Sequence, residues 1–336
     1  MELKNLEDVD SAEMFKVYDR WPEIAKNAFS QKFKKINIPN INHIVFAGMG
    51  GSGTIGDIIS AILSKEDIHI TNVKGYTLPK TVDSETLVVV TSVSGNTDET
   101  VTILHNATKT SAKIIAFASG GNLGKICQEK GIFFQEIELI HSPRASLTNF
   151  LFSILNILEE LIPINHSDIL DAITILDNTQ KNISSDNLSE TNQAIELAEF
   201  IKKTPCIYYP AGLQSAAIRF KNSLQENAKT HVMTEDVIEA CHNGIVSWEK
   251  DLNAQPILVE GFEDNVKTKE RWEIIKQYFS ENQIDYFSIN SIRGNILSKI
   301  IHLIYLFDYA SIYLAVLRKI DPTPVKSIDF IKSKLL

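Results

Sequence analysis

The sequence predicts an α/β protein with two tandem, doubly wound parallel-sheet lobes joined by a helical connector. The chain has 336 residues, more than the roughly 250 to 300 at which a single core usually stops growing, which favours two lobes. Short apolar runs alternate with helical patterns in residues 41–150 and again in residues 201–336, and this alternation is typical of parallel sheets covered by helices. Residues 151–200 show helical spacing alone and form the connector.

The first 40 residues form a separate helical segment in this prediction. Residues 8–35 carry apolar side chains at helical spacing, which predicts one amphipathic helix. Its apolar face consists of Met14, Tyr18, Trp21, Ile24, Ala25 and Phe29. A short apolar strand at 44–47 then leads into the glycine-rich segment 48–54, and a helix is expected over 55–63.

The remaining elements follow from the same two patterns, helical spacing of apolar residues for helices and short apolar runs for strands. In the first lobe we expect strands at 68–73, 86–91, 113–118 and 132–137 and helices at 97–108 and 121–130. In the second lobe we expect strands at 206–209, near His231, at 256–260 and near Tyr286, helices at 214–229 and 266–279, and long C-terminal helices.

Composition excludes several classes of function. Hydrophobic residues make up 44% and charged residues 22% of the chain, as in ordinary soluble proteins. The net charge of -9 is spread along the chain without a basic run, so nucleic acid is not an expected partner. The three cysteines lie far apart, which argues against a disulfide framework or a zinc site and fits a reducing cytosol.

Neither secretion nor membrane insertion is expected. The N-terminal residues are polar and acidic, unlike a signal peptide. The most apolar stretch, 300–317, contains His302 and Asp308 and is flanked by charges, so we expect a buried helix rather than a membrane span. We therefore expect a cytoplasmic protein without a membrane partner.

The segment Gly48-Met-Gly-Gly-Ser-Gly53 fits the G-x-G-x-x-G pattern of dinucleotide sites. The pattern alone is weak, and the following strand ends in residues 71–75 without the carboxylate that would hold a ribose. An NAD site is thus disfavoured.

Three polar loops follow neighbouring strands of the first lobe and open helices. They contain Ser52, then Ser92, Ser94 and Thr97, and then residues 119–121. Loops at the carboxyl ends of parallel strands meet at one edge of the sheet, and helix N-termini favour anions. Each loop alone could be an ordinary helix cap or turn, but three together favour a phosphate site.

A metal site is not expected. Two His and two Glu come close in sequence at His231, Glu235, Glu239 and His242, without the His-x-x-x-His spacing of a helical zinc site. We also expect no other cofactor.

Several segments resemble those of a known family. In the first lobe, residues 48–52 with Gly56-Asp57, residues 90–97 with Glu99, residues 119–121 and Pro143-Arg144 resemble sugar isomerase (SIS) domains. In the second lobe, Arg219-Phe-Lys221, 224–229 and 239–244 with Trp248 are similar to the corresponding segments of the bifunctional phosphoglucose/phosphomannose isomerases of archaea.

This resemblance implies two SIS-type lobes per subunit, a homodimer and a sugar 6-phosphate substrate. It assigns the phosphate to Ser52, Ser92, Ser94 and Thr97 and to the backbone of Gly50 and Gly51. It implies that Glu226 moves a proton between C1 and C2 and that His242 of the neighbouring subunit assists ring opening. It assigns stabilisation of the enediolate to Arg144, and assistance at the ring oxygen to Lys332, with Lys326 and Lys334 as close competitors.

The residue types suit aldose–ketose isomerisation. A carboxylate in a water-poor site can shuttle the proton, and a guanidinium can stabilise the developing oxyanion. The chain departs from the family pattern at Val93, Phe220, Gln225 and Cys241, and Cys241 adjoins His242, which puts the orientation of that imidazole in doubt.

Three alternatives stay open. Glu226 could be a solvated helix residue paired with Lys229. The chain could be a non-catalytic SIS sensor of sugar phosphates, which would not need Glu226, His242 and Arg144. An amidotransferase-type sugar isomerase would carry an N-terminal lobe with a nucleophilic cysteine, whereas this chain begins with a polar helix.

Overall fold

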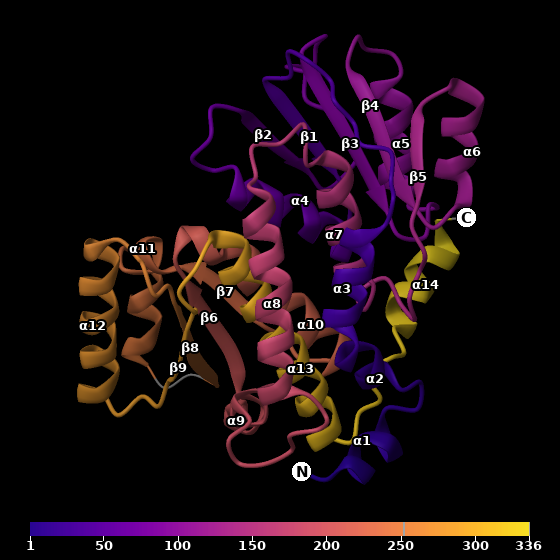
Figure 1. Cartoon of the computed structure of the whole chain (residues 1–336). Helices are drawn as coiled ribbons and strands as arrows, with labels where there is room; N and C mark the ends of the chain where they lie inside the picture. The colour runs from indigo at the N-terminus through magenta and orange to yellow at the C-terminus, as the bar shows by residue number, and fades with distance from the viewer. Residues whose placement is uncertain (251–252, 336) are drawn as a thin grey trace. The chain divides into compact units, whose positions relative to one another are not determined.

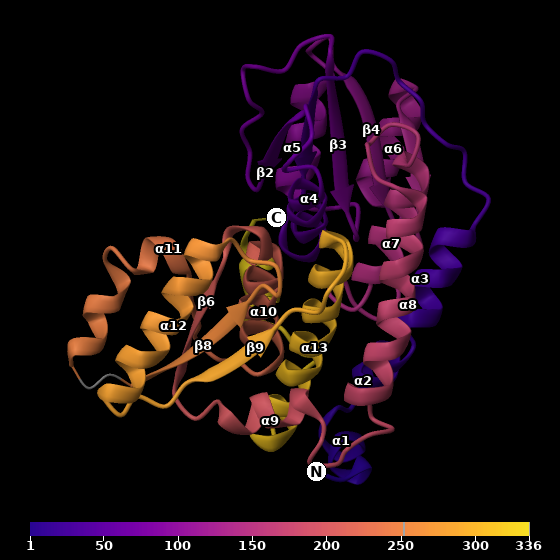
Figure 2. The same cartoon turned by 60° about the vertical axis from the view of Figure 1, so that its left-hand side comes forward.

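The computed structural model describes residues 1–250 and 253–335, and contacts divide the chain into two compact units (Figure 1, Figure 2). The β1–β5 unit comprises residues 20–174 and 296–298, and the β6–β9 unit comprises residues 1–19, 175–295 and 299–336. Segments 1–40 and 151–200 are each shared between the two units. The predicted domain boundaries themselves stay a prediction.

The β1–β5 unit contains a five-stranded parallel sheet in the order β2-β1-β3-β4-β5. Its strands are β1 (His43–Ala47), β2 (His69–Val73), β3 (Thr86–Ser92), β4 (Lys113–Ala118) and β5 (Phe133–Glu136). Every residue of β1 and β3 is buried, as expected for central strands covered on both faces. After β1 the chain adds β2 on one side, and it then adds β3, β4 and β5 on the other side of β1. Open α/β sheets bind ligands at such a switch point in strand order.

Helices cover this sheet on both faces. They are α3 (Trp21–Ser30), α4 (Gly50–Ile62), α5 (Asp98–Ala107), α6 (Gly121–Lys130) and α7 (Leu147–Leu158). Alternate strand residues such as Val45, Val88 and Ala116 share one core cluster with Leu104 of α5 and Leu123 of α6. The crossovers are right-handed, and the strand order changes side after β2. The helix α4 therefore covers the face of the sheet opposite to α5 and α6, where it contacts α7.

The β6–β9 unit contains a four-stranded parallel sheet in the order β7-β6-β8-β9. Its strands are β6 (Thr204–Tyr209), β7 (Met233–Asp236), β8 (Ala254–Glu260) and β9 (Phe287–Asn290). Its helices include α9 (Gln193–Phe200), α10 (Gln214–Asn227), α11 (Val237–Ala240), α12 (Val266–Glu281) and α14 (Lys326–Lys334). Residues of α11 and α12 form a core cluster with Tyr208 and Leu258, and Figure 1 shows α10 on the other side of this sheet. The structure thus shows the predicted α/β fold with two parallel sheets.

The helix α13 (Ile296–Leu317) begins in one unit and continues through the other. Among the described residues, α13 is the one helix that is long and apolar enough to cross a membrane. Of its most apolar 18-residue stretch, 89% is buried inside the protein. This burial agrees with the expected core helix. The helix α8 (His166–Ile183) is likewise divided between the units, at residues 174 and 175.

The single N-terminal helix predicted over residues 8–35 is wrong. The structure has three helices there, α1 (Leu3–Val9), α2 (Met14–Asp19) and α3. Glu13 takes a positive φ of 54° between α1 and α2, a conformation that no right-handed helix contains. Pro22 stands in the first turn of α3, where it has no N–H to donate to the preceding turn and therefore cannot continue α2. The six predicted apolar residues are nonetheless buried.

Candidate active site

The three polar loops of the β1–β5 unit meet at the carboxyl ends of β1, β3 and β4. The Ser52 hydroxyl accepts a hydrogen bond from Val93 N at 3.2 Å, which links the loop after β1 to the loop after β3. The Ser119 hydroxyl donates to Val93 O at 2.6 Å, and Leu123 N donates to Gly95 O at 2.9 Å. These bonds bring together the loops that the sequence analysis expected at one edge of the sheet.

Glycine is needed where two of these loops touch. Gly95 has a φ of +68°, and a Cβ atom there would lie 1.9 Å from the carbonyl oxygen of Gly120. Any side chain at Gly95 would therefore force the two loops apart. The close backbone approach fixes the loop that carries Ser94 against the start of α6.

The candidate phosphate hydroxyls differ in exposure. Ser92 is 1% exposed, donates to the Thr97 hydroxyl at 3.0 Å and accepts from Gly95 N at 3.1 Å. Ser94 is exposed, and Thr97 is half-buried at the N-cap of α5. Ser92 thus supports the loop from below, while Ser94 and Thr97 lie nearer to solvent.

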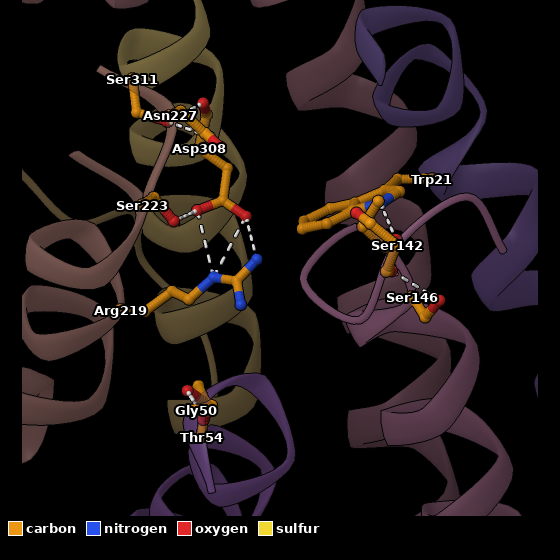
Figure 3. Close-up of polar contacts among 11 residues, drawn as sticks. Trp21, Gly50, Thr54, Ser142, Ser146, Arg219, Ser223, Asn227, Asp308 and Ser311 are labelled. Carbon is orange, nitrogen blue, oxygen red and sulfur yellow. Dashed lines mark hydrogen bonds and ion pairs between the residues drawn. The ribbon is translucent and has the colours of Figure 1, made fainter. Parts of the chain in front are cut away.

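The helix α4 begins inside the glycine-rich segment, at Gly50 rather than at residue 55 as expected. Ser52 therefore lies in the first helical turn instead of a loop. Gly50 takes a φ of +53°, and its carbonyl accepts from the Thr54 hydroxyl at 3.2 Å (Figure 3). The first N–H groups of a helix lack partners within the helix and carry partial positive charge, so Gly50 and Gly51 suit an anion.

A lysine that the sequence analysis missed lies beside these loops. Lys74 follows β2 and pairs with Asp57 of α4 at 2.5 Å. It lines a small cavity together with Ser52, Gly53 and Thr91. A possible signal was its place just after the strand that neighbours β1, since the carboxyl ends of adjacent parallel strands meet.

Arg144 lies in the same unit, in a turn just before α7, and is 6% exposed. The turn is held by Ser146, whose hydroxyl donates to Ile140 O at 3.0 Å and accepts from Ile140 N at 2.9 Å. The indole of Trp21 donates to Ala145 O at 2.9 Å (Figure 3). The backbone on both sides of Arg144 is thereby fixed.

The other candidate residues belong to the β6–β9 unit. Glu226 is half-buried in the last turn of α10. The helix ends at Asn227, and Lys229 takes a φ of +52°. The Lys229 ammonium donates to the main-chain carbonyl of Glu226 at 2.5 Å and to Pro322 O at 3.3 Å, which ties the end of α10 to the segment before α14.

His242 lies in an exposed turn after α11. Asp236 caps α11 by accepting from Ile238 N at 2.8 Å, and His242 N donates to Glu239 O at 2.9 Å. Burial, followed by the charges of Glu239 and Asp236, raises the pKa of Glu235, whose carboxylate closely approaches Gly244. Acidic residues thus surround and hold the turn that carries His242.

Cys241 is half-buried beside His242. Burial raises the pKa of its thiol, and the nearby charge of Arg271 acts in the opposite direction. At neutral pH the side chain is therefore a neutral thiol.

Lys332, together with its competitors Lys326 and Lys334, lies on α14, and no residue of that helix is buried. Within residues 1–250 and 253–335, no group of three His, Cys, Asp or Glu side chains could hold a metal ion. The structure thus joins the three polar loops in one unit, which also carries Arg144, and places Glu226, His242 and Lys332 in the other.

Comparisons with known proteins agree with this pattern. Residues 190–335 match the family model described as the bacterial phospho-glucose isomerase C-terminal SIS domain. The bifunctional phosphoglucose/phosphomannose isomerase of Caldicellulosiruptor bescii is 32% identical over 334 residues, which cover 96% of this chain and 98% of the relative. This chain belongs to the bifunctional phosphoglucose/phosphomannose isomerase family. It is an enzyme, as the family name implies.

Two further comparisons concern proteins with other names. The D-glucosamine-6-phosphate 4-epimerase of Sulfolobus acidocaldarius is 30% identical over 256 residues, covering 73% of this phosphoglucose/phosphomannose isomerase family member and 77% of the relative. Among solved structures, the C-terminal domain of glucosamine-fructose-6-phosphate aminotransferase from Francisella tularensis has a TM-score of 0.68 at 16% identity, over 93% of this chain and 98% of that one. The structural likeness supports the fold.

Proposed function

We propose that this enzyme interconverts glucose 6-phosphate and mannose 6-phosphate with fructose 6-phosphate through an enediol or enediolate, without a metal. The observation that carries the proposal is the joined set of phosphate-type loops after β1, β3 and β4, found in a chain that matches a named bifunctional isomerase along its whole length. The family supports the class of reaction, and individual residues are assigned to its steps.

The phosphate of the substrate rests on the β1–β5 unit in this proposal. Backbone N–H groups of Gly50 and Gly51 and the hydroxyls of Ser52, Ser94 and Thr97 face the anion, while Ser92 holds Thr97 in place. Lys74 lies at the same edge of the sheet and offers its ammonium hydrogens to the phosphate, while Asp57 offsets its charge. Binding energy from this unreactive group positions C1 and C2 for the chemistry.

Proton transfer is assigned to Glu226. A carboxylate removes the proton from C2 of the aldose and returns it to C1, or the reverse for the ketose. Protonation of C2 on one face yields the glucose configuration and on the other face the mannose configuration. The one base Glu226 serves both substrates because rotation about the C2–C3 bond of the enediol presents either face of C2 to its carboxyl group. Negative charge develops on the C1 and C2 oxygens, and the guanidinium of Arg144 stabilises it.

Ring opening precedes isomerisation because most hexose phosphate is cyclic. We assign this step to His242, contributed by a second subunit, and to Lys332. The exposure of the His242 turn on its own chain is consistent with this arrangement, and α14, without a buried residue, carries its lysines to solvent. The active species is accordingly a homodimer.

A coupled assay tests the proposal. Fructose 6-phosphate formation is measured from each hexose 6-phosphate with excess EDTA, for the wild type, Glu226→Gln and the exposed control Glu199→Gln. We expect activity on both sugars, full activity in the control and a loss of about 1,000-fold in Glu226→Gln.

Three outcomes contradict parts of the proposal. Activity abolished by EDTA refutes the metal-free mechanism. Conversion of D-glucosamine 6-phosphate alone, at C4, points to the activity named for the Sulfolobus acidocaldarius relative. Tight binding of sugar phosphates with no turnover points to the sensor.

A further inference from the structure

A line of polar residues joins two helices in the core of the β6–β9 unit. Arg219, Ser223 and Asn227 lie four residues apart along α10 and therefore share one face of that helix. Asp308 and Ser311, three residues apart on α13, lie opposite them (Figure 3). We call these five residues the polar seam.

Every member of the polar seam is hydrogen-bonded. Arg219 Nη2 donates to Asp308 Oδ2 at 2.6 Å, and Arg219 Nε lies 3.2 Å from both carboxylate oxygens. The Ser223 hydroxyl donates to Asp308 Oδ1 at 2.5 Å. Asn227 Nδ2 donates to the Ser311 hydroxyl at 2.8 Å, and that hydroxyl donates to Asp308 O at 2.6 Å.

The ion pair within the polar seam is almost completely shielded from water. The side chains of Arg219 and Asp308 are 2% and 0% exposed. Burial acts to lower the pKa of Arg219, and the carboxylate of Asp308 more than offsets this, so the pKa of the guanidinium is raised. The guanidinium therefore stays charged and forms an ion pair with the carboxylate of Asp308.

Stability alone does not explain such a pair. Buried ion pairs can often be replaced by apolar residues of similar volume without loss of stability, whereas removal of one partner is costly. The same two helices already make an apolar contact, since Phe220 and Phe307 stack with ring centroids 4.4 Å apart. What the polar seam adds is geometry, because a slide or rotation of α10 by one residue would leave buried charges without partners.

The geometry matters because the polar seam borders the proposed base. Glu226 stands between Ser223 and Asn227 in sequence, in the last turn of α10. Helix ends fray when nothing anchors them, and the bond from Asn227 to Ser311 anchors the final residue of this helix. Glu226 thus projects from the part of α10 whose place the polar seam determines.

We propose that the polar seam is a positioning device, in which the Arg219–Asp308 pair and the Asn227–Ser311 bond set the register of α10 so that the Glu226 carboxylate reaches C1 and C2 of the substrate. This inference rests on the proposed function. None of the five residues touches substrate in this account. The charge of Glu226 is among those that raise the pKa of Arg219, after Asp308 and Tyr18, so the guanidinium also acts on Glu226 through its charge. The Asn227–Ser311 bond carries no charge and acts through position alone.

The test replaces the pair rather than breaking it. Arg219→Met combined with Asp308→Leu fills the same space without polar groups, and thermal unfolding checks that the double variant is folded. We expect a melting temperature at or near that of the wild type, a kcat lower by about 30- to 100-fold, and a Kd for fructose 6-phosphate within about twofold. Misplacement of a catalytic group by about 1 Å suffices for such a loss.

Two further variants separate position from stability. Phe220→Leu weakens the apolar contact between the same helices without touching the polar seam, and we expect lower stability with an unchanged kcat. Asn227→Leu with Ser311→Ala removes the anchor nearest Glu226, and we expect a kcat lower by about 10-fold. Should the Arg219–Asp308 replacement not fold, this second pair decides in its place.

The outcomes distinguish the two claims. A wild type without isomerase activity refutes the proposed function and, with it, this inference. An active wild type whose folded double variant keeps kcat within about twofold refutes the inference alone. A fall in affinity for fructose 6-phosphate equal to the fall in kcat also overturns it, since a positioning device for the base changes turnover and leaves phosphate binding intact.

Discussion

The polar loops of the β1–β5 unit and the polar seam of the β6–β9 unit are held in place by different kinds of contact. In the β1–β5 unit, positions are fixed by backbone: Gly95 and Gly120 touch, and Val93 N and O bond to serine hydroxyls. In the β6–β9 unit, positions are fixed by side chains, with Arg219 bonded to Asp308 in the core. The phosphate group is the same in every sugar phosphate, so a rigid backbone cradle formed by the loops after β1, β3 and β4 suits it. The proposed proton transfer depends on one side chain, the carboxylate of Glu226, whose position is set by α10.

Exposure follows the same division. Ser52 and Ser92 both belong to the β1–β5 unit and are buried, so the proposed phosphate cradle draws its residues from one unit. His242 and Lys332 are exposed, so the proposed reaction needs further parts to enclose them. We therefore expect changes in the cradle to alter substrate binding, and changes around Glu226 to alter turnover.

The largest expected effect comes from breaking the buried pair on one side. Arg219→Met leaves the Asp308 carboxylate, 0% exposed, without its cation in the core. We expect the free energy of unfolding to fall by about 3–5 kcal/mol, measured by urea denaturation. A loss below about 1 kcal/mol would show that the carboxylate reaches water or another partner, and would weaken the contrast with the backbone-held loops.

A glycine substitution probes the cradle in the same way. Gly95→Ala places a methyl group against Gly120 O and requires a residue with Cβ at a φ of +68°. We expect a loss of at least about 2 kcal/mol in stability together with weaker binding of fructose 6-phosphate. Gly131→Ala serves as the control, because its positive φ of 63° is similar but a Cβ there meets nothing within 4 Å. Equal effects at both sites would refute the role of the close approach.

The helix α13 of the β6–β9 unit also carries a half-buried titratable group, His302. Burial lowers the pKa of His302 to about 4, and Nδ1 of its ring lies 2.8 Å from the Thr179 hydroxyl. The unfolded value is about 6.5, so as pH falls from 6.5 to 4 the unfolded chain takes up a proton that the folded protein does not.

Stability from His302 is therefore fully present above pH 6.5 and declines as the pH falls. Between pH 7 and pH 5 we expect the wild type to lose about 2 kcal/mol more than His302→Asn, measured by urea denaturation at both pH values. Equal losses in the two proteins would mean that the ring is protonated in the folded state.

The smallest effect is expected at the exposed edge of the cradle. Ser94→Ala removes one hydroxyl that faces solvent in the loop after β3. We expect KM to rise by about 10-fold, the equivalent of one hydrogen bond to a charged group, with kcat within about twofold. A fall in kcat at unchanged KM would place Ser94 with the chemistry instead of the phosphate.

Much of the fold could be predicted because its signals are local. The helix expected at 121–130 matches α6, and the runs around Ile44, Val88 and Ile257 became central strands, since buried parallel strands are continuous apolar runs. The N-terminal prediction failed because helical spacing continued across Glu13 and Pro22, where backbone conformation and proline chemistry interrupt the helix.

The site was only partly accessible from sequence. The phosphate loops follow from strand order and composition, and the structure joins them as expected. The polar seam could not be predicted, because Arg219 and Asp308 are 89 residues apart in the chain and their pairing depends on how α10 packs against α13. Lys74 was missed for a similar reason, since its partner Asp57 lies on a different element.

The division between binding and chemistry is tested most directly on one variant. Titration calorimetry with fructose 6-phosphate and the coupled assay are run on Glu226→Gln and on the wild type. We predict a Kd within about twofold of the wild type and a kcat lower by about 1,000-fold. A Kd that rises together with the loss of kcat, or a kcat that survives the substitution, would contradict the account.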